Sequence, residues 1–148
     1  MHTSPAIDAA RQFLAVAWDG PVPPDAALTA ALDRLIAAYH LTLDANPSDS
    51  DLDAPRDSGP AFFQRVGARF ADYGLYPKAD PTDGPEAQLG WGDAIDDLGD
   101  ITLDMREVVW LADNVGADDA HWLFRLHFFH WGTHARDLLR YLHGRQFS

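Results

Sequence analysis

The chain has 148 residues, no cysteine and a formal net charge of −12 at pH 7. Its length is typical of one domain, and the lack of cysteine excludes disulfides and thiolate metal sites. Its negative charge argues against anionic partners, namely nucleic acids and anionic membrane surfaces. The N-terminus lacks the basic region of a signal peptide, and no apolar run approaches the roughly 18 residues that a membrane span needs, so we expect a cytoplasmic protein.

The charge is distributed unevenly along the chain. Residues from His121 onward contain four arginines and a single acid, Asp137, whereas residues 1–120 carry a net charge of −15. The simplest interpretation is that this basic C-terminal segment packs against acidic neighbours in the same chain. The alternative is a docking strip for an acidic partner.

Three helices are expected in the first half of the chain, and no segment of the whole chain is a good strand candidate. The first covers about 5–18, because Ser4 before Pro5 combines a side-chain cap with a proline at the first helical position. The second covers about 24–43 and the third about 61–73, because apolar residues recur there every three or four positions.

Two long polar segments separate these helices from each other and from the rest of the chain. They cover about 44–60 and 74–92 and are rich in Asp, Pro, Gly and other polar residues, which indicates loops. Loops of this length in a small domain are often functional or disordered, and the sequence does not decide between the two.

Two further helices are expected at about 93–115 and 118–143. Gly116 ends the former, and Asp118 or Asp119 can cap the latter. So short a connection makes the two helices an antiparallel pair. The sequence therefore predicts an all-α fold, a single-domain bundle of about five helices over residues 1–148 whose last two form a long antiparallel hairpin.

Each of these last two helices carries a polar stripe beside its apolar face. At about 100° per residue, the stripe of the fifth helix contains His127, His130, His134, Asp137 and Tyr141. The stripe of the fourth helix contains Asp93, Asp97, Asp100, Asp104 and Glu107. The two stripes face each other in one handedness of the hairpin and point apart in the other, and the sequence leaves the handedness open.

Folding the hairpin places residues that lie at the same distance from the turn next to each other. We call the line along which the two polar stripes would then meet the seam, and such residues are of equal height. The expected pairs are Asp104 with His130, Asp100 with His134, Glu107 with His127, and Asp97 with Asp137. Neutral imidazole and carboxylate oxygen are ligands for zinc, iron, manganese and nickel. The candidate ligands of a divalent transition metal are therefore His130, His134, Asp100 and Asp104, with His127, Asp97 and Asp137 nearby.

The alternative to a metal site is a purely structural seam. Hydrogen bonds between imidazole and carboxylate satisfy half-buried polar groups and fix the register of two helices. The chain contains neither the Glu-x-x-His pattern of di-iron bundles nor a His-Glu-x-x-His motif. Because histidine titrates near neutrality, a pH-responsive seam is a third interpretation.

Other chemistries rank lower. The magnesium-dependent all-α nucleotide pyrophosphohydrolases hold Mg²⁺ on acidic helix pairs, but here one helix offers histidines. The chain lacks a nucleophile elbow and a glycine-rich phosphate loop. Core packing explains the tryptophans of the last two helices best, with an aromatic-lined pocket as the alternative.

Two segments resemble a bacterial domain-of-unknown-function family, the one numbered 5063. They are WGDAIDDLGDI, starting at Trp91, and HFFHWGTHARDLLRYLH, starting at His127. The family pattern, an acidic helix and then His-Trp-Gly-x-His-Ala-x-x-x-Leu, maps onto His130, Trp131, Gly132, His134, Ala135 and Leu139. The resemblance is specific over roughly residues 91–143 and implies a small all-α bacterial cytoplasmic protein, without implying an activity.

Gly132 lies inside an expected helix, where glycine costs about 1 kcal/mol relative to alanine. Such a glycine indicates a close approach of a neighbouring helix or room for a ligand. Because no catalytic motif is complete, the leading hypothesis is a non-enzymatic domain that binds a protein partner or a small ligand. The second hypothesis is a metal-dependent enzyme with its site between the last two helices. The sequence leaves the oligomeric state open.

Overall fold

The computed structural model describes residues 4–148, and in this part of the chain six α-helices accompany a small two-stranded sheet. The α-helices are α1 (Pro5–Trp18), α2 (Asp25–Leu41), α3 (Pro60–Arg69), α4 (Ala94–Asn114), α5 (Ala117–Leu126) and α6 (Thr133–Phe147). The remaining elements are β1 (Leu75–Lys78), the 3-10 turn η1 (Pro81–Asp83), β2 (Gly90–Asp93) and the π-helical segment η2 (Phe128–Gly132).

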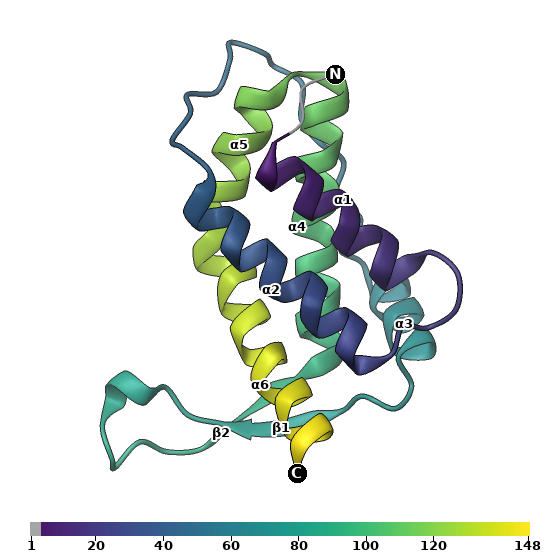
Figure 1. The fold of residues 1–148 in the computed structure, drawn as a ribbon, viewed down its shortest axis with the longest axis vertical. Coiled ribbons are helices and arrows are strands. Elements are labelled where there is room, and N and C mark those ends of the chain that lie inside the picture. The colour runs from purple at the N-terminus through teal and green to yellow at the C-terminus, as the bar shows by residue number, and fades with distance from the viewer. Residues whose placement is uncertain (1–3) are drawn as a thin grey trace.

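The helix α4 is the centre of the bundle. It contacts α1, α3, α5 and α6. The consecutive elements α5, η2 and α6 form what we call the α5–α6 arm, and the α1–α2 pair lies across α4 and this arm (Figure 1). The largest fully buried side chains come from several of these helices, namely Trp131, Phe13, Phe62 and Phe124. In residues 4–148 no helix combines the length and the apolar character needed to cross a membrane.

Side-chain caps explain where two of the helices begin. The Ser4 hydroxyl accepts a hydrogen bond from the backbone N–H of Ile7 at 3.0 Å, as expected for the start of α1. Asp93 accepts one from the N–H of Ile95 at 2.9 Å and so caps α4. The cap expected from Asp118 or Asp119 is wrong, because Gly116 takes that position and both acids lie in the first turn of α5.

The all-α prediction is correct in outline but misses a β-hairpin. Within the segment expected to be a loop, β1 and β2 pair antiparallel, with Tyr76 opposite Gly92 (Figure 1). The sequences LYPK and GWGD contain Pro and Gly, which are depleted in strands, so nothing in the local pattern indicates pairing. The hairpin lies at the end of the bundle where α4 begins and α6 ends.

The expected fifth helix is also wrong as one continuous element. Helix α5 ends at Leu126, the wider turns of η2 follow, and α6 begins after them. Helix α6 extends to Phe147 rather than to His143. The ring of Phe128 covers Gly132, where a Cβ atom would lie 2.5 Å from a ring carbon. A side chain of the same segment, and neither a neighbouring helix nor open space for a ligand, therefore lies against this glycine. Phe128 in turn stacks on Tyr39.

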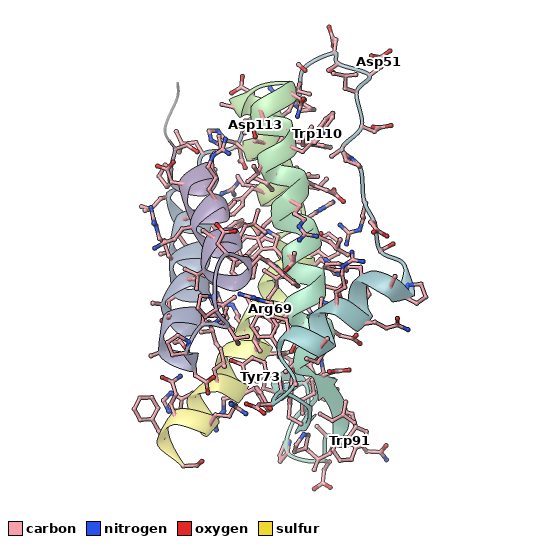
Figure 2. The ribbon with its side chains drawn as sticks, turned by 90° about the vertical axis from the view of Figure 1, so that its right-hand side faces the viewer. Asp51, Arg69, Tyr73, Trp91, Trp110 and Asp113 are labelled. Atoms are coloured by element: carbon pink, nitrogen blue, oxygen red, sulfur yellow. The ribbon has the colours of Figure 1, made fainter. Side chains whose placement is uncertain are left out.

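Residues 42–59 form neither helix nor strand and follow the outer side of α4 from α2 to α3 (Figure 2). Contacts along its length hold this segment on the bundle. Asp44 pairs with Arg125 at 2.6 Å, the N–H of Ser48 donates to Asp119 at 3.1 Å, and Arg56 reaches Asp104 at 2.9 Å. The last of these contacts brings the segment to the polar seam of the bundle.

Candidate metal centre

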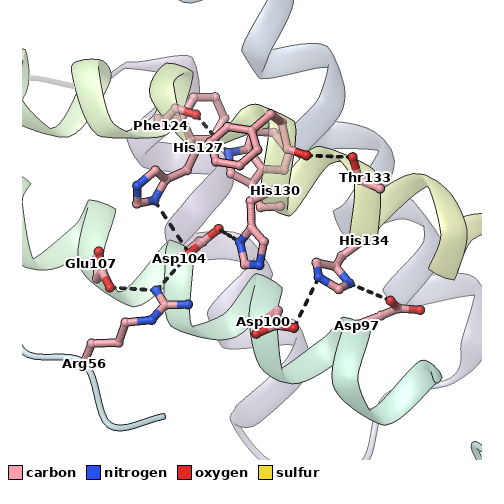
Figure 3. A network of polar contacts seen from close by, with 12 residues as sticks. Arg56, Asp97, Asp100, Asp104, Glu107, Phe124, His127, His130, Thr133 and His134 are labelled. Atoms are coloured by element: carbon pink, nitrogen blue, oxygen red, sulfur yellow. Dashed lines mark hydrogen bonds and ion pairs between the residues drawn. The ribbon is translucent and has the colours of Figure 1, made fainter. Parts of the chain in front are cut away.

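The polar stripes of α4 and of the α5–α6 arm face each other, which settles the handedness of the hairpin (Figure 3). Two of the pairs expected from equal height are present. The Nδ1 atom of His130 lies 2.7 Å from Oδ2 of Asp104, and Nε2 of His134 lies 3.2 Å from Oδ2 of Asp100.

The other two expected pairs are wrong. Asp97 contacts Nδ1 of His134 at 2.7 Å instead of meeting Asp137, and Asp137 pairs with Lys78 at 3.0 Å. Glu107 pairs with Arg56 at 2.7 Å. The physical reason is competition from cations outside the helix pair, since Arg56 of the 42–59 segment pairs with Glu107 and Lys78 of β1 pairs with Asp137.

His127 is a peripheral member of the stripe. Its Nδ1 atom lies 3.7 Å from Oδ1 of Asp104, which is beyond hydrogen-bonding distance. The carboxylate is nevertheless close enough to raise the pKa of His127 above its ordinary value. We therefore place His127 beside the centre rather than among the groups that converge in it.

Three side chains converge on one point of the seam. Asp100, His130 and His134 each offer a donor atom, and these three atoms lie within 4.8 Å of one another. The exposed fractions of the three side chains are 25%, 33% and 24%, so the point is neither sealed in the core nor fully open to solvent. The rings of His130 and His134 are nearly perpendicular, with centroids 4.9 Å apart.

Both histidines are oriented in the same way. The Nδ1 atom of His130 faces Asp104 and that of His134 faces Asp97, each at 2.7 Å. An imidazole that donates its Nδ1–H to a carboxylate keeps its lone pair on Nε2. The Nε2 atoms are therefore the ring nitrogens available to a metal ion, and a carboxylate behind each ring is the usual partner of a metal-binding histidine.

The two orienting carboxylates are buried and held by further donors. Asp97 and Asp104 are 3% and 1% exposed. Asp97 also accepts a hydrogen bond from the Tyr76 hydroxyl, and Asp104 accepts one from Arg56 at 2.9 Å. A buried carboxylate is costly unless it is paired and hydrogen-bonded, and here each has a partner on both oxygens.

Sequence reasoning did not identify Tyr76 or Arg56. Both lie in segments expected to be loops, more than 20 positions away from their partners, and no periodic pattern connects them to the seam. Only the tertiary structure brings the hairpin and the 42–59 segment to the two ends of the centre.

The electrostatics of the seam favour the charged form of Asp104 and the protonated form of His134, because the pKa of the first is lowered and that of the second is raised. Burial alone would raise the pKa of Asp104, but the nearby His127 and hydrogen bonds from His130 and Arg56 outweigh it and hold that pKa below its usual range. Burial alone would lower the pKa of His134, but Asp97 and Asp100 outweigh it and raise that pKa.

Asp96 shows the opposite behaviour at the exposed edge of the same stripe. Burial raises its pKa, and the charges of Asp93, Asp100 and Asp97 raise it further. The N-terminal end of α4 therefore carries more negative charge than its surroundings balance, which favours a cation at this end of the seam.

Comparison with known proteins shows the fold. Neither the models of protein families nor the curated proteins match this chain. The chain is similar to a solved structure, protein BF1032 from Bacteroides fragilis, with a TM-score of 0.64 and 17% sequence identity over 96% of this chain and 93% of that one. At this identity the likeness extends to the arrangement of the elements, and the resemblance to the family numbered 5063 stays a prediction.

Proposed function

We propose that this protein binds a divalent transition-metal ion through Nε2 of His130, Nε2 of His134 and a carboxylate oxygen of Asp100. The observation that carries the proposal is that both histidines direct Nδ1 at a buried carboxylate, which leaves two Nε2 atoms beside the Asp100 carboxylate. Two imidazoles and one carboxylate form a donor set suited to zinc, iron or manganese rather than to magnesium or calcium.

The arrangement is more typical of a catalytic site than of a structural one. Structural zinc sites are closed by four protein ligands, whereas catalytic sites use three and keep a position for water or substrate. The three donors lie at the surface of the seam, where a further ligand can approach. We therefore place the metal-dependent enzyme above the non-enzymatic alternative, with metal-activated water as the chemistry that the ion would supply.

The proposal is tested by metal analysis of protein purified without a histidine tag. We expect close to one equivalent of transition metal in the wild type and none in the His130→Ala/His134→Ala double variant, measured by plasma mass spectrometry. The matched control is His40→Ala/His143→Ala, which removes two exposed histidines outside the seam and should retain the metal.

A second measurement separates loss of the site from loss of the fold. Zn²⁺ is titrated calorimetrically into chelator-stripped protein, and circular dichroism is recorded for each variant. A wild type that binds no zinc, or a folded double variant that binds as tightly as the wild type, would overturn the proposal. In the first case the histidines and carboxylates would be a structural seam.

A second candidate function is the binding of a protein partner or a small apolar ligand. An apolar stripe on α5 and η2 favours it. Trp122, Leu126 and Phe129 recur at helical spacing and are 36%, 48% and 75% exposed. Light scattering and affinity capture with the Leu126→Ser/Phe129→Ser variant test this role. This role would be dismissed if the wild type is monomeric and if the wild type and the variant capture the same proteins.

A further inference from the structure

One side chain of the β-hairpin, Tyr76, reaches a carboxylate of the candidate metal centre. The Tyr76 hydroxyl on β1 donates to Oδ2 of Asp97, whose Oδ1 faces Nδ1 of His134 at 2.7 Å. A continuous chain of hydrogen bonds thus leads from the hairpin through a buried carboxylate to one of the proposed ligands.

The path of Tyr76 to this carboxylate depends on a glycine in the opposite strand. Gly92 faces Tyr76 in the hairpin, and a Cβ atom on Gly92 would lie 2.2 Å from the tyrosine ring. On α6, the ring of Tyr141 packs beside it with centroids 5.2 Å apart. The tyrosine is therefore held between β2 and α6 with its hydroxyl directed at Asp97.

A second contact joins the hairpin to the same part of α6. Lys78 at the end of β1 pairs with Asp137, which lies one turn beyond His134. The hairpin thus contacts the seam on both sides of His134, through Asp97 on α4 and Asp137 on α6. This placement makes the hairpin a wall of the centre rather than a separate appendage.

We propose that Tyr76 is a positioning residue of the metal centre, and that through it metal binding and hairpin docking strengthen each other. The inference rests on the proposed metal site. The hydroxyl fixes the orientation of the Asp97 carboxylate, and the carboxylate fixes the ring of His134 so that Nε2 faces Asp100. Because coupling between two binding events is reciprocal, a metal ion that holds His134 in place must also stabilise the docked hairpin.

The test compares two tyrosine-to-phenylalanine variants. Tyr76→Phe removes only the hydroxyl, and we expect Zn²⁺ affinity, measured by calorimetry, to fall by up to about tenfold. That is the lower end of the effect of removing a group that contacts a metal ligand directly, and Tyr76 acts on His134 through Asp97. The matched control is Tyr73→Phe, because the Tyr73 hydroxyl also donates to a carboxylate, Asp25, at 2.8 Å, outside the centre. It should bind zinc like the wild type.

Two further readouts distinguish positioning from a general loss of stability. The visible spectrum of the Co²⁺-loaded protein should change in Tyr76→Phe but not in Tyr73→Phe. Zinc should slow hydrogen exchange of the β1 and β2 amides in the wild type and slow it less in Tyr76→Phe. Gly92→Ala keeps the hydroxyl but displaces the ring, so it should reproduce the weaker zinc binding.

The outcomes separate this inference from the proposed function. Zinc binding that is equal in the wild type, Tyr76→Phe and Tyr73→Phe, with equal protection of the hairpin, would overturn the positioning role and leave the metal site standing. A wild type that binds no zinc would overturn both.

Discussion

His130 and Asp104 join η2 to α4 through an Nδ1 to Oδ2 contact of 2.7 Å that spans 26 positions of the sequence. Asp104 is 1% exposed and also accepts a hydrogen bond from Arg56. The carboxylate therefore pairs with two side chains from different segments, the guanidinium of Arg56 and the imidazole of His130. Its removal should affect both the stability of the bundle and the orientation of His130.

Asp104→Asn should lower the free energy of unfolding by about 2–3 kcal/mol, because it weakens hydrogen bonds between charged groups in a buried place. Urea denaturation of metal-free protein measures the change. The control is Asp113→Asn, which disrupts an exposed pair with Arg11 and should cost less than about 1 kcal/mol. Equal effects of the two substitutions would contradict the role given to Asp104.

The stability of the metal-free protein should decrease as the pH rises from about 6 to about 8. The pKa values of His127 and His134 are higher in the folded protein than the ordinary value of 6.5. The folded state therefore holds these protons more tightly, so the stabilisation is complete below pH 6.5 and is lost as the pH passes the folded-state values.

The His127→Gln/His134→Gln variant should flatten this profile, measured by urea denaturation in the presence of a chelator. A wild-type stability that is constant or increases over the same range would contradict the prediction. At acid pH, Asp104 makes stability change with pH in the opposite direction, because its pKa is lower in the folded protein. Its stabilisation is present above the ordinary pKa of 3.8 and is lost as the pH falls through the lower folded-state pKa.

Gly99→Ala should destabilise the protein by about 1–3 kcal/mol despite the better helix propensity of alanine. A Cβ atom at Gly99 would lie 2.4 Å from the ring of Phe63, where α3 packs on α4. The matched control is Gly144→Ala on α6, which meets no atom within 4 Å and should stabilise the helix by up to about 1 kcal/mol. Thermal denaturation of both variants should show shifts of opposite sign.

Arg56→Ala should release the 42–59 segment from the seam. Arg56 pairs with both Asp104 and Glu107, and its loss leaves the buried Asp104 with one donor fewer, at a cost of about 1–2 kcal/mol. The control is Arg65→Ala, whose 3.7 Å pair with Asp57 is exposed and should matter little. Limited proteolysis should cut residues 42–59 faster in Arg56→Ala only. Unchanged cleavage there would argue against this anchor.

Local physics was sufficient to predict most of the helices. The caps at Ser4 and Asp93 and the apolar periodicity place the starts of α1 and α4 within one residue. The same reasoning predicted the pairs Asp104 with His130 and Asp100 with His134, because a short turn between two helices fixes which residues are level. These features depend on contacts close in sequence or on helix geometry alone.

The remaining features depend on interactions that the sequence does not encode locally. The α1–α2 pair packs on the last helices through long-range contacts of α1 with α4 and α5 and of α2 with α6, and the residue pattern of the hairpin alone does not determine its handedness. The strands β1 and β2 exist because Tyr76 and Lys78 find partners on α4 and α6, which compensates for poor strand propensity. Whether the three converging side chains hold a metal ion stays a prediction for the experiments above.

The wide turn η2 is equivalent to one residue inserted into an α-helix, because its hydrogen-bonded rings contain one residue more than those of an α-helix. The buried Phe124 before it and Leu138 after it both still face the core, so the turn absorbs the insertion locally. Deletion of the exposed Phe129 should therefore leave a regular helix with its packing face intact, and His130 and His134, still four positions apart, should stay on one face of that helix. A related chain that is one residue shorter here would keep both the fold and the histidine pair, so the two histidines, and not the length of this turn, would identify the site in such a chain.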